Sequence, residues 1–477
     1  MATRYSSPID DAYITFRYAV NIGTGHGFVY NVGERVLGTT TPLFALILAP
    51  FTRFGMHPDT VATFLSISCD VIVCAVLYRM VTRTLGWFAG TAAALFYALS
   101  YANIAACGFG MEAQLFILFV ILAIDLSARK PTASAAMCGL AALTRPEGFV
   151  LAAILFISLI ADGRHNWRTV LAPALVFLAV IGPWVTFAWL YFGSPLPHSV
   201  TAKIGQPNAS LASWFSFFVA RNPVVMLLWL GAAVGVGTAV MKRSRELILF
   251  GAWLVLYTLF FVVARPPFWL GHYFVPTAMA LSALAGIGIA EGIGRAVHRP
   301  AVGTIVAGML AVAILVVAWS PSIASAKWRR RVAEQVFIPL ARWVDRETPE
   351  QAVVHAADIG YLGYYSGRTI EDAASLVTPD LARYRAAHRS EANSDISYVM
   401  RSLPDYVVLP VRGRIVERFT SSPDFLHEYA PRVRFQINGE TSLRPPPGTG
   451  QRYARDSRFM ADYIVYQKKL PVRRAPQ

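Results

Sequence analysis

Residues 168–192, RTVLAPALVFLAVIGPWVTFAWLYF, hold one charged side chain, Arg168, at their very start. An apolar stretch of roughly 20 residues is long enough to cross the hydrocarbon core of a bilayer as a helix. Nine other apolar segments share this character: 60–80, 85–103, 113–128, 133–145, 147–161, 223–241, 246–263, 273–290 and 302–319. The sequence predicts a mainly α-helical, polytopic membrane protein with about ten spans.

The composition excludes several other classes of protein. Hydrophobic residues make up 55% of the chain and charged residues only 15%, where a soluble domain has about a quarter charged. The formal net charge of +15 comes without an aromatic-interleaved basic face, so we expect membrane lipids as partners and no nucleic acid. The four cysteines all lie in or beside apolar segments and are expected to be small buried hydrophobes.

The distribution of basic residues predicts the topology. Cytoplasmic loops of membrane proteins are enriched in Lys and Arg. Alternate loops here carry such residues: Arg79, Arg83, Arg129, Lys130, Arg164, Arg168, Lys242, Arg243, Arg245, Arg295 and Arg299. The opposite face then receives 1–57, 104–112, 145–147, 193–222, 264–272 and everything beyond 320. Residues 40–56 are apolar but short, and we interpret them as interfacial helices.

Three regions follow from this pattern. Residues 1–57 are expected to form a first outer loop with an Asp pair and interfacial helices, and 58–320 a transmembrane domain. Residues 321–477 read as an extracytoplasmic, soluble α/β domain, with a helix at 328–348 and strands at 351–358 and 404–411. The predicted location is the cell membrane.

Polar residues at membrane depth are costly and are therefore candidates for function. On this topology the conspicuous ones share the outer face: Asp10, Asp11, Glu112, Arg145, Glu147, His198, Lys203, Arg265 and His272. Two adjacent carboxylates repel, which can poise one as a base, but Asp10 and Asp11 are equally good helix caps. Arg145 could bind phosphate or form a structural salt bridge. The histidines lack partners at zinc-ligand spacing.

Several motifs in matching order resemble the GT-C superfamily of polyprenyl-phosphate-sugar-dependent membrane glycosyltransferases. The most extensive is 9–44, IDDAYITFRYAVNIGTGHGFVYNVGERVLGTTTPLF. The others are GMEAQLF at 110–116, LTRPEG at 143–148, YFGSPLPHSVTAK at 191–203, HYFVP at 272–276 and DIGYLGYYSGRTIEDAASLVTP at 358–379. The chain is most similar to the arabinofuranosyltransferase-like branch, which includes the mycobacterial terminal arabinofuranosyltransferases.

The resemblance implies an active site on the outer face and a sugar donor carried on a polyprenyl monophosphate. It also implies inversion at the anomeric carbon, with Asp10 as general base and Asp11 as its partner, or the reverse. Arg145 and Lys203 are assigned to the donor phosphate by their charge, and Glu112, Glu147, His198 and His272 match other motif positions. Family members have a transmembrane helix before this loop, so a first helix is expected to be missing from the chain as written.

Three functions are compatible with these features. The first is an inverting glycosyltransferase that moves a sugar, with arabinofuranose as one candidate, to a cell-envelope glycan or lipid acceptor. The alternative is a polytopic transporter or lipid-carrier flippase, although no internal repeat is found. The third is a non-catalytic scaffold. The sequence leaves the sugar, the acceptor and the oligomeric state open, and the outer loops show no acidic cluster that would require a divalent cation.

Overall fold

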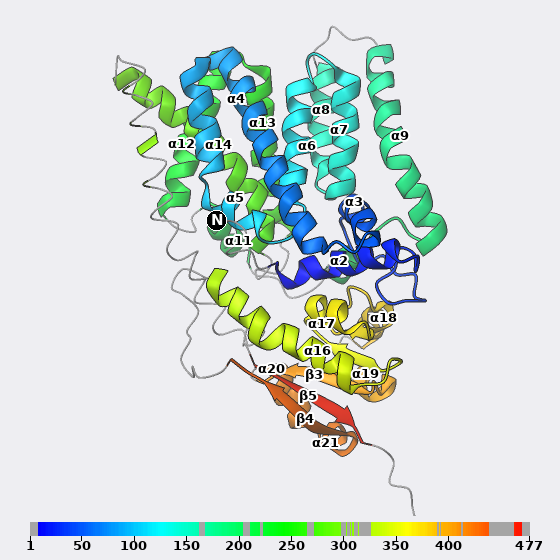
Figure 1. Ribbon diagram of the computed structural model, residues 1–477. Coiled ribbons are helices and arrows are strands. Elements are labelled where there is room, and N and C mark those ends of the chain that lie inside the picture. The colour runs from blue at the N-terminus through cyan, green and yellow to red at the C-terminus, as the bar shows by residue number, and fades with distance from the viewer. Residues whose placement is uncertain are drawn as a thin grey trace, which may run out of the picture.

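The structure is a computed structural model that describes residues 8–161, 167–203, 210–219, 223–264, 271–296, 326–388, 391, 393–411, 414–437 and 462–469, with isolated positions between 302 and 313. A bundle of apolar helices forms one half of the molecule (Figure 1). Its main members are α4 (Pro58–Ala98), α6 (Ala113–Leu126), α7 (Pro131–Thr144), α8 (Gly148–Ala161), α9 (Trp167–Phe192), α12 (Pro223–Met241), α13 (Arg245–Ala264) and α14 (Phe274–Ala296).

The bundle confirms the predicted mainly helical membrane fold. Five of the described helices, α4, α9, α12, α13 and α14, are long and apolar enough to cross a membrane, and α6, α7 and α8 are shorter apolar helices. The two spans predicted at 60–80 and 85–103 are joined in α4 across a kink at Gly86, whose φ of 87° suits glycine. The pair predicted around Thr144 is two helices, α7 and α8. The span predicted at 302–319 lies outside the contiguous described ranges.

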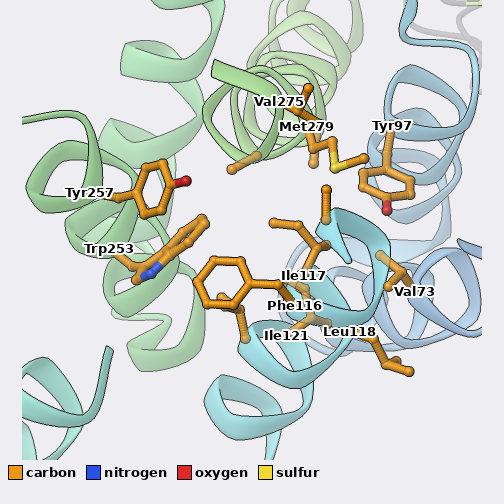
Figure 2. Close-up of a cluster of buried hydrophobic side chains, with 14 of the residues drawn as sticks. Val73, Tyr97, Phe116, Ile117, Leu118, Ile121, Trp253, Tyr257, Val275 and Met279 are labelled. Carbon is orange, nitrogen blue, oxygen red and sulfur yellow. The ribbon is translucent and has the colours of Figure 1, made fainter. Parts of the chain in front are cut away.

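The core of the bundle is apolar and rich in aromatic side chains. Figure 2 shows Phe116 of α6 facing Trp253 and Tyr257 of α13, with Met279 of α14 and Tyr97 of α4 nearby. The ring centroids of Phe116 and Trp253 lie 6.2 Å apart, as do those of Phe116 and Tyr257. These contacts fix the N-terminal half of α6 against α13, and Glu112 immediately precedes α6.

The C-terminal region contains a five-stranded mixed sheet in the order β2-β1-β3-β5-β4. Strand β1 pairs in parallel with β2 and β3, while β5 pairs antiparallel with β3 and β4. The strands are β1 (Val353–Ala356), β2 (Thr369–Asp372), β3 (Tyr406–Pro410), β4 (Tyr429–Phe435) and β5 (Tyr463–Lys468). The predicted strands at 351–358 and 404–411 correspond to β1 and β3.

Helices surround this sheet. Residues 326–332 are helical and continue through a π-helical turn, η2 (Ala333–Phe337), into α16 (Ile338–Glu347), which confirms the predicted helix at 328–348. The remaining helices of this region are α17 (Ile359–Ser366), α18 (Pro379–Ala387), α19 (Ser394–Ser402), α20 (Arg414–Thr420) and α21 (Pro423–Glu428). Helix α17 packs on α2 (Asp10–Gly23).

Helix α2 and helix α3 (Pro42–Arg53) lie between the bundle and the C-terminal region (Figure 1). Helix α2 and the loop after it are bonded to the C-terminal region at several points. Arg17 Nη2 donates to the carbonyl of Arg368 at 2.7 Å, and its guanidinium stacks on the Tyr30 ring at 4.3 Å. Asn31 exchanges two hydrogen bonds with Ile370, at 2.9 and 3.0 Å. The first loop is therefore held against β2 and α17.

The contact between α2 and α17 depends on a glycine. A Cβ at Gly360 would lie 1.7 Å from the Asp10 carbonyl oxygen, a backbone atom that cannot swing away. We expect Gly360→Ala to force the two helices apart and to lower the thermal unfolding midpoint, at a cost of about 1–3 kcal/mol or more. Gly292→Ala is the control, since nothing lies within 4 Å of its Cβ position. Equal midpoints for the two variants would contradict this close approach.

Candidate active site

A buried ion-pair cluster lies where α6 begins and α7 turns into α8. Arg145 Nη1 donates to Glu112 Oε1 at 2.8 Å, and Arg145 Nη2 donates to Glu147 Oε1 at 3.3 Å. Glu112 is the residue before α6, and Arg145 and Glu147 form the turn between α7 and α8. All three side chains are less than a tenth exposed. The structure therefore realises the salt-bridge interpretation of Arg145, with one cation shared by two carboxylates.

Aromatic rings connect this cluster to a second group of polar residues. The Arg145 guanidinium lies 5.5 Å from the Tyr273 ring and 5.8 Å from the Phe116 ring. Tyr273 belongs to the short helix η1 (Gly271–Tyr273), and its ring centroid lies 4.4 Å from that of His272. His272 is thus placed one residue from a ring that covers the buried ion pair.

His272 faces the first loop. Its Nδ1 lies 3.8 Å from Asp11 Oδ2, within ion-pair distance. Asp11 sits in the first turn of α2 and keeps 36% of its side chain exposed, whereas His272 keeps 11%. The loop before α6 supports the start of α2, because the Ile9 N–H donates to the Phe109 carbonyl at 3.1 Å. Asp11 is therefore an accessible carboxylate at the junction of α2, η1 and the segment 108–112 before α6.

Asp10 has a different role from its neighbour. The Gly360 N–H donates to Asp10 Oδ2 at 2.9 Å, and the Tyr361 N–H donates to Asp10 Oδ1 at 2.8 Å. These amides are among the unsatisfied donors at the start of α17. Of the two alternatives for the Asp pair, the cap of its own helix is not found, since α2 has no side-chain cap and both residues lie inside its first turn. Asp10 caps a helix 350 residues away.

The surroundings of Asp10 alter its acidity. Desolvation between α2 and α17 raises the pKa of Asp10 to about 8, repulsion from Asp358 adds to the rise, and the two amide N–H groups oppose it. Asp358 precedes α17 and accepts a hydrogen bond from the Tyr463 hydroxyl. Two carboxylates therefore meet at one helix start, and Asp10 favours a proton there.

The raised pKa predicts a pH-dependent contact. The pKa of Asp10 rises from 3.8 to about 8, so the folded state binds the proton more tightly, and the stabilisation present below about pH 4 is lost as pH rises toward 8. We expect the unfolding midpoint of the wild type to fall across this window relative to Asp10→Asn, which cannot ionise. The measurement is a thermal melt of both proteins at several pH values.

The control for this melt is Asp380→Asn, because the Asp380 side chain is largely exposed. The unfolding midpoint of this variant should change with pH in the same way as that of the wild type. A wild-type midpoint that rises relative to Asp10→Asn across the same window would contradict the assignment. It would mean that the ionised carboxylate is the better cap.

The other predicted site residues are less closely joined to this group. His198 begins the short helix α10 (His198–Lys203), and its backbone N–H donates to the Leu37 carbonyl at 2.7 Å. The side chain of Lys203 and all of Arg265 lie outside the described residues. Within the described ranges, no three His, Cys, Asp or Glu side chains gather as a metal site would require. The structure thus brings together Asp10, Asp11, His272 and the Arg145 cluster.

Sequence reasoning did not assign roles to Asp358, Tyr361 or Tyr273, which surround the predicted residues. Tyr361 contributes its amide to Asp10, and its hydroxyl donates to the Pro8 carbonyl at 2.6 Å. Tyr273 follows His272 directly in the HYFVP motif. Both tyrosines lie inside quoted motifs, but their contacts depend on the packing of distant segments.

Two family models match parts of the sequence. The model described as dolichyl-phosphate-mannose-protein mannosyltransferase matches residues 39–189. A domain of unknown function, DUF8728, matches residues 324–466. No curated protein matches the sequence.

Solved structures resemble nearly the whole chain. ArnT from Cupriavidus metallidurans in the apo state matches with a TM-score of 0.60 and 15% identity, over 99% of this chain and 95% of that chain. The same protein bound to undecaprenyl phosphate matches with a TM-score of 0.57 and 16% identity over the same shares. The apo oligosaccharyltransferase from Archaeoglobus fulgidus gives 0.54 and 13% identity, over 93% of this chain and 72% of that chain.

These similarities concern the fold first and the activity second. At such low identity the structural matches establish the fold, which is the predicted GT-C fold. Together with the mannosyltransferase match, they support a membrane glycosyltransferase of the GT-C superfamily. The comparisons do not distinguish the arabinofuranosyl branch from other branches.

Proposed function

We propose that this chain transfers a sugar from a polyprenyl-phosphate donor to a hydroxyl acceptor, with inversion at the anomeric carbon. The observation that carries the proposal is the accessible Asp11 carboxylate beside His272, which is connected through the Tyr273 ring to a buried ion-pair cluster on a GT-C fold. The neighbour bound to undecaprenyl phosphate supports a lipid monophosphate as the donor carrier.

Asp11 is the general base in this proposal, in place of the initial preference for Asp10. Both oxygens of Asp10 accept backbone N–H groups, and its raised pKa means that it already holds a proton near neutral pH, so it is poorly suited to remove one from a substrate. Asp11 is more accessible and lies on the side of η1. Its carboxylate removes the proton from the acceptor hydroxyl as that oxygen bonds to the anomeric carbon and the bond to the phosphate oxygen breaks.

His272 and Lys203 each interact with a negatively charged group in this scheme. His272 holds the Asp11 carboxylate in place from 3.8 Å. Lys203 keeps its assignment to the donor phosphate, whose departing charge needs a cation. Arg145 is better suited to a structural task than to phosphate binding, because two carboxylates already surround it and the cluster carries a net charge of −1. Glu112 and Glu147 hold the Arg145 guanidinium in place, and the guanidinium in turn packs against the Tyr273 ring.

The finer assignments extend this proposal. The site faces the outer side of the cell membrane, as the distribution of basic loops predicts, and the C-terminal region lies on that side. The transferred sugar is arabinofuranose, and the acceptor is a glycan or lipid of the cell envelope, as the sequence motifs imply. His198 lies on the first-loop side through its bond to Leu37 and is a candidate for acceptor recognition.

The test is a reaction of the purified chain in proteoliposomes with labelled polyprenyl-phosphate sugars and a panel of glycan acceptors. A transferase should release free polyprenyl phosphate and attach the label to an acceptor. A flippase would move the intact donor across the bilayer without breaking the sugar–phosphate bond, and that outcome would overturn the proposal. Turnover with another sugar in place of arabinofuranose would revise only the donor sugar.

A further inference from the structure

Three arginines converge on one buried carboxylate far from the proposed active site. Asp125, near the end of α6, has a fully buried side chain. It accepts hydrogen bonds from Arg79 Nη2 at 2.7 Å and Arg129 Nη2 at 2.6 Å, and also from Arg83 Nη2. One negative charge therefore holds three positive charges, and the group keeps a net charge of +2.

The guanidinium groups retain unused donors. Each arginine side chain has five N–H donors, and among the described residues all of these contacts use Nη2 alone. Arg79, Arg83 and Arg129 keep 56%, 34% and 45% of their side chains exposed. Asp125 thus holds the three guanidinium groups in place while part of each side chain stays exposed, as in a preformed anion site.

The location of this group indicates which anion it meets. It lies at the end of the bundle opposite α2 and the C-terminal region, near the kink of α4 (Figure 1). Tyr78 and Trp87, which flank Arg79 and Arg83 in the sequence, are 42% and 49% exposed. Exposed Trp and Tyr at the ends of apolar helices mark the level of lipid head groups. The arginines therefore face the interface between lipid and water.

We propose that Arg79, Arg83 and Arg129 form a binding site for the head group of an anionic phospholipid. The planar guanidinium matches two phosphate oxygens at once, and the net charge of +2 favours a lipid whose phosphate is not neutralised by an ammonium group. The site is independent of the proposed transfer reaction, since it lies at the other end of the spans and involves none of the residues near Asp11.

The experiment measures lipid binding to the purified full chain in detergent, by native mass spectrometry and by thermal shift. The probes are phosphatidylglycerol, phosphatidylcholine with matched acyl chains, and inorganic phosphate. Phosphatidylglycerol should bind and raise the unfolding midpoint, and the other two should not. Arg79→Gln should weaken phosphatidylglycerol binding about tenfold, because it removes a charge-assisted contact while two arginines still pair with Asp125.

The matched control is Lys242→Gln, which removes an exposed charge at the same end of the bundle. Its location there follows from Ser244, two residues on, whose hydroxyl bonds the Thr84 hydroxyl of α4 at 3.2 Å. It should leave phosphatidylglycerol binding within about twofold of the wild type, since it lies outside the guanidinium group. If Arg79→Gln does not fold, Arg79→Lys is used instead. It keeps the charge and should still weaken binding several-fold, because an ammonium group cannot contact two phosphate oxygens as the planar guanidinium does. Equal losses in the Lys242 and Arg79 variants, equal binding of phosphatidylcholine, or equal binding of inorganic phosphate would overturn the proposal.

Discussion

Asp11→Asn should reduce the rate of sugar transfer by about 10²–10⁴ while leaving the protein folded, because a positioned general base contributes on this order. Asparagine has nearly the same shape as aspartate but cannot accept the proton of the acceptor hydroxyl. The Asp11 side chain is 36% exposed and faces His272 at 3.8 Å, so its replacement leaves no buried charge behind. The measurement is the turnover number at saturating donor, together with the unfolding midpoint.

The control for this variant is Glu34→Gln, which replaces an exposed carboxylate in the same first loop that accepts a hydrogen bond from Asn31 Nδ2 at 3.0 Å. It should keep wild-type turnover. Asp11→Glu should recover part of the rate, since it restores the base at a shifted position. Full turnover in Asp11→Asn would remove this residue from the chemistry and return the role of base to Asp10.

Arg145→Met should destabilise the protein severely, by about 3–5 kcal/mol, because it leaves two buried carboxylates without their cation. Glu112 and Glu147 keep 3% and 7% of their side chains exposed, so water cannot replace the guanidinium. We expect a large drop in the unfolding midpoint and in the yield of folded protein. Arg145→Lys should fall between, since one ammonium cannot contact both carboxylates as the guanidinium fork does.

A triple variant tests whether the loss of stability comes from the unpaired carboxylates or from the change in side-chain shape. Arg145→Met combined with Glu112→Gln and Glu147→Gln removes all three charges and should recover much of the lost stability. If Arg145→Met alone kept the wild-type midpoint and lost only donor binding, the initial assignment of Arg145 to the donor phosphate would be correct. A structural role for Arg145 therefore predicts a loss of stability in Arg145→Met, whereas a phosphate-binding role predicts a loss of donor binding alone.

Much of the bundle could be predicted from hydropathy, because each helix in a bilayer must satisfy its own backbone and carry an apolar surface. The turn at Arg145 was also foreseeable, since proline and charge interrupt the apolar run there. Strands β1 and β3 are buried apolar runs and were predicted. Strand β2, Thr369–Asp372, has four residues and two carboxylates, so it lacks the signal that would have identified it.

The candidate residues could be chosen from sequence, but their partners could not. Intramembrane charges usually pair, which favoured a partner for Arg145 without saying which carboxylate. Asp10 and Asp11 are neighbours of the same type, and only the fold separates them. The partners of Asp10 are the backbone amides of Gly360 and Tyr361. Every residue except proline has such an amide, so the sequence does not indicate which ones will bond.

The most direct test of the central claim is the anomeric configuration of the transferred sugar, determined by NMR on the product of the wild-type reaction. A single displacement, with Asp11 deprotonating the acceptor and the polyprenyl phosphate leaving from the opposite side, predicts a configuration inverted relative to the donor. Retained configuration would require a covalent intermediate and would contradict the role given to Asp11. Recovery of intact donor with no new glycosidic bond would contradict the assignment as a transferase.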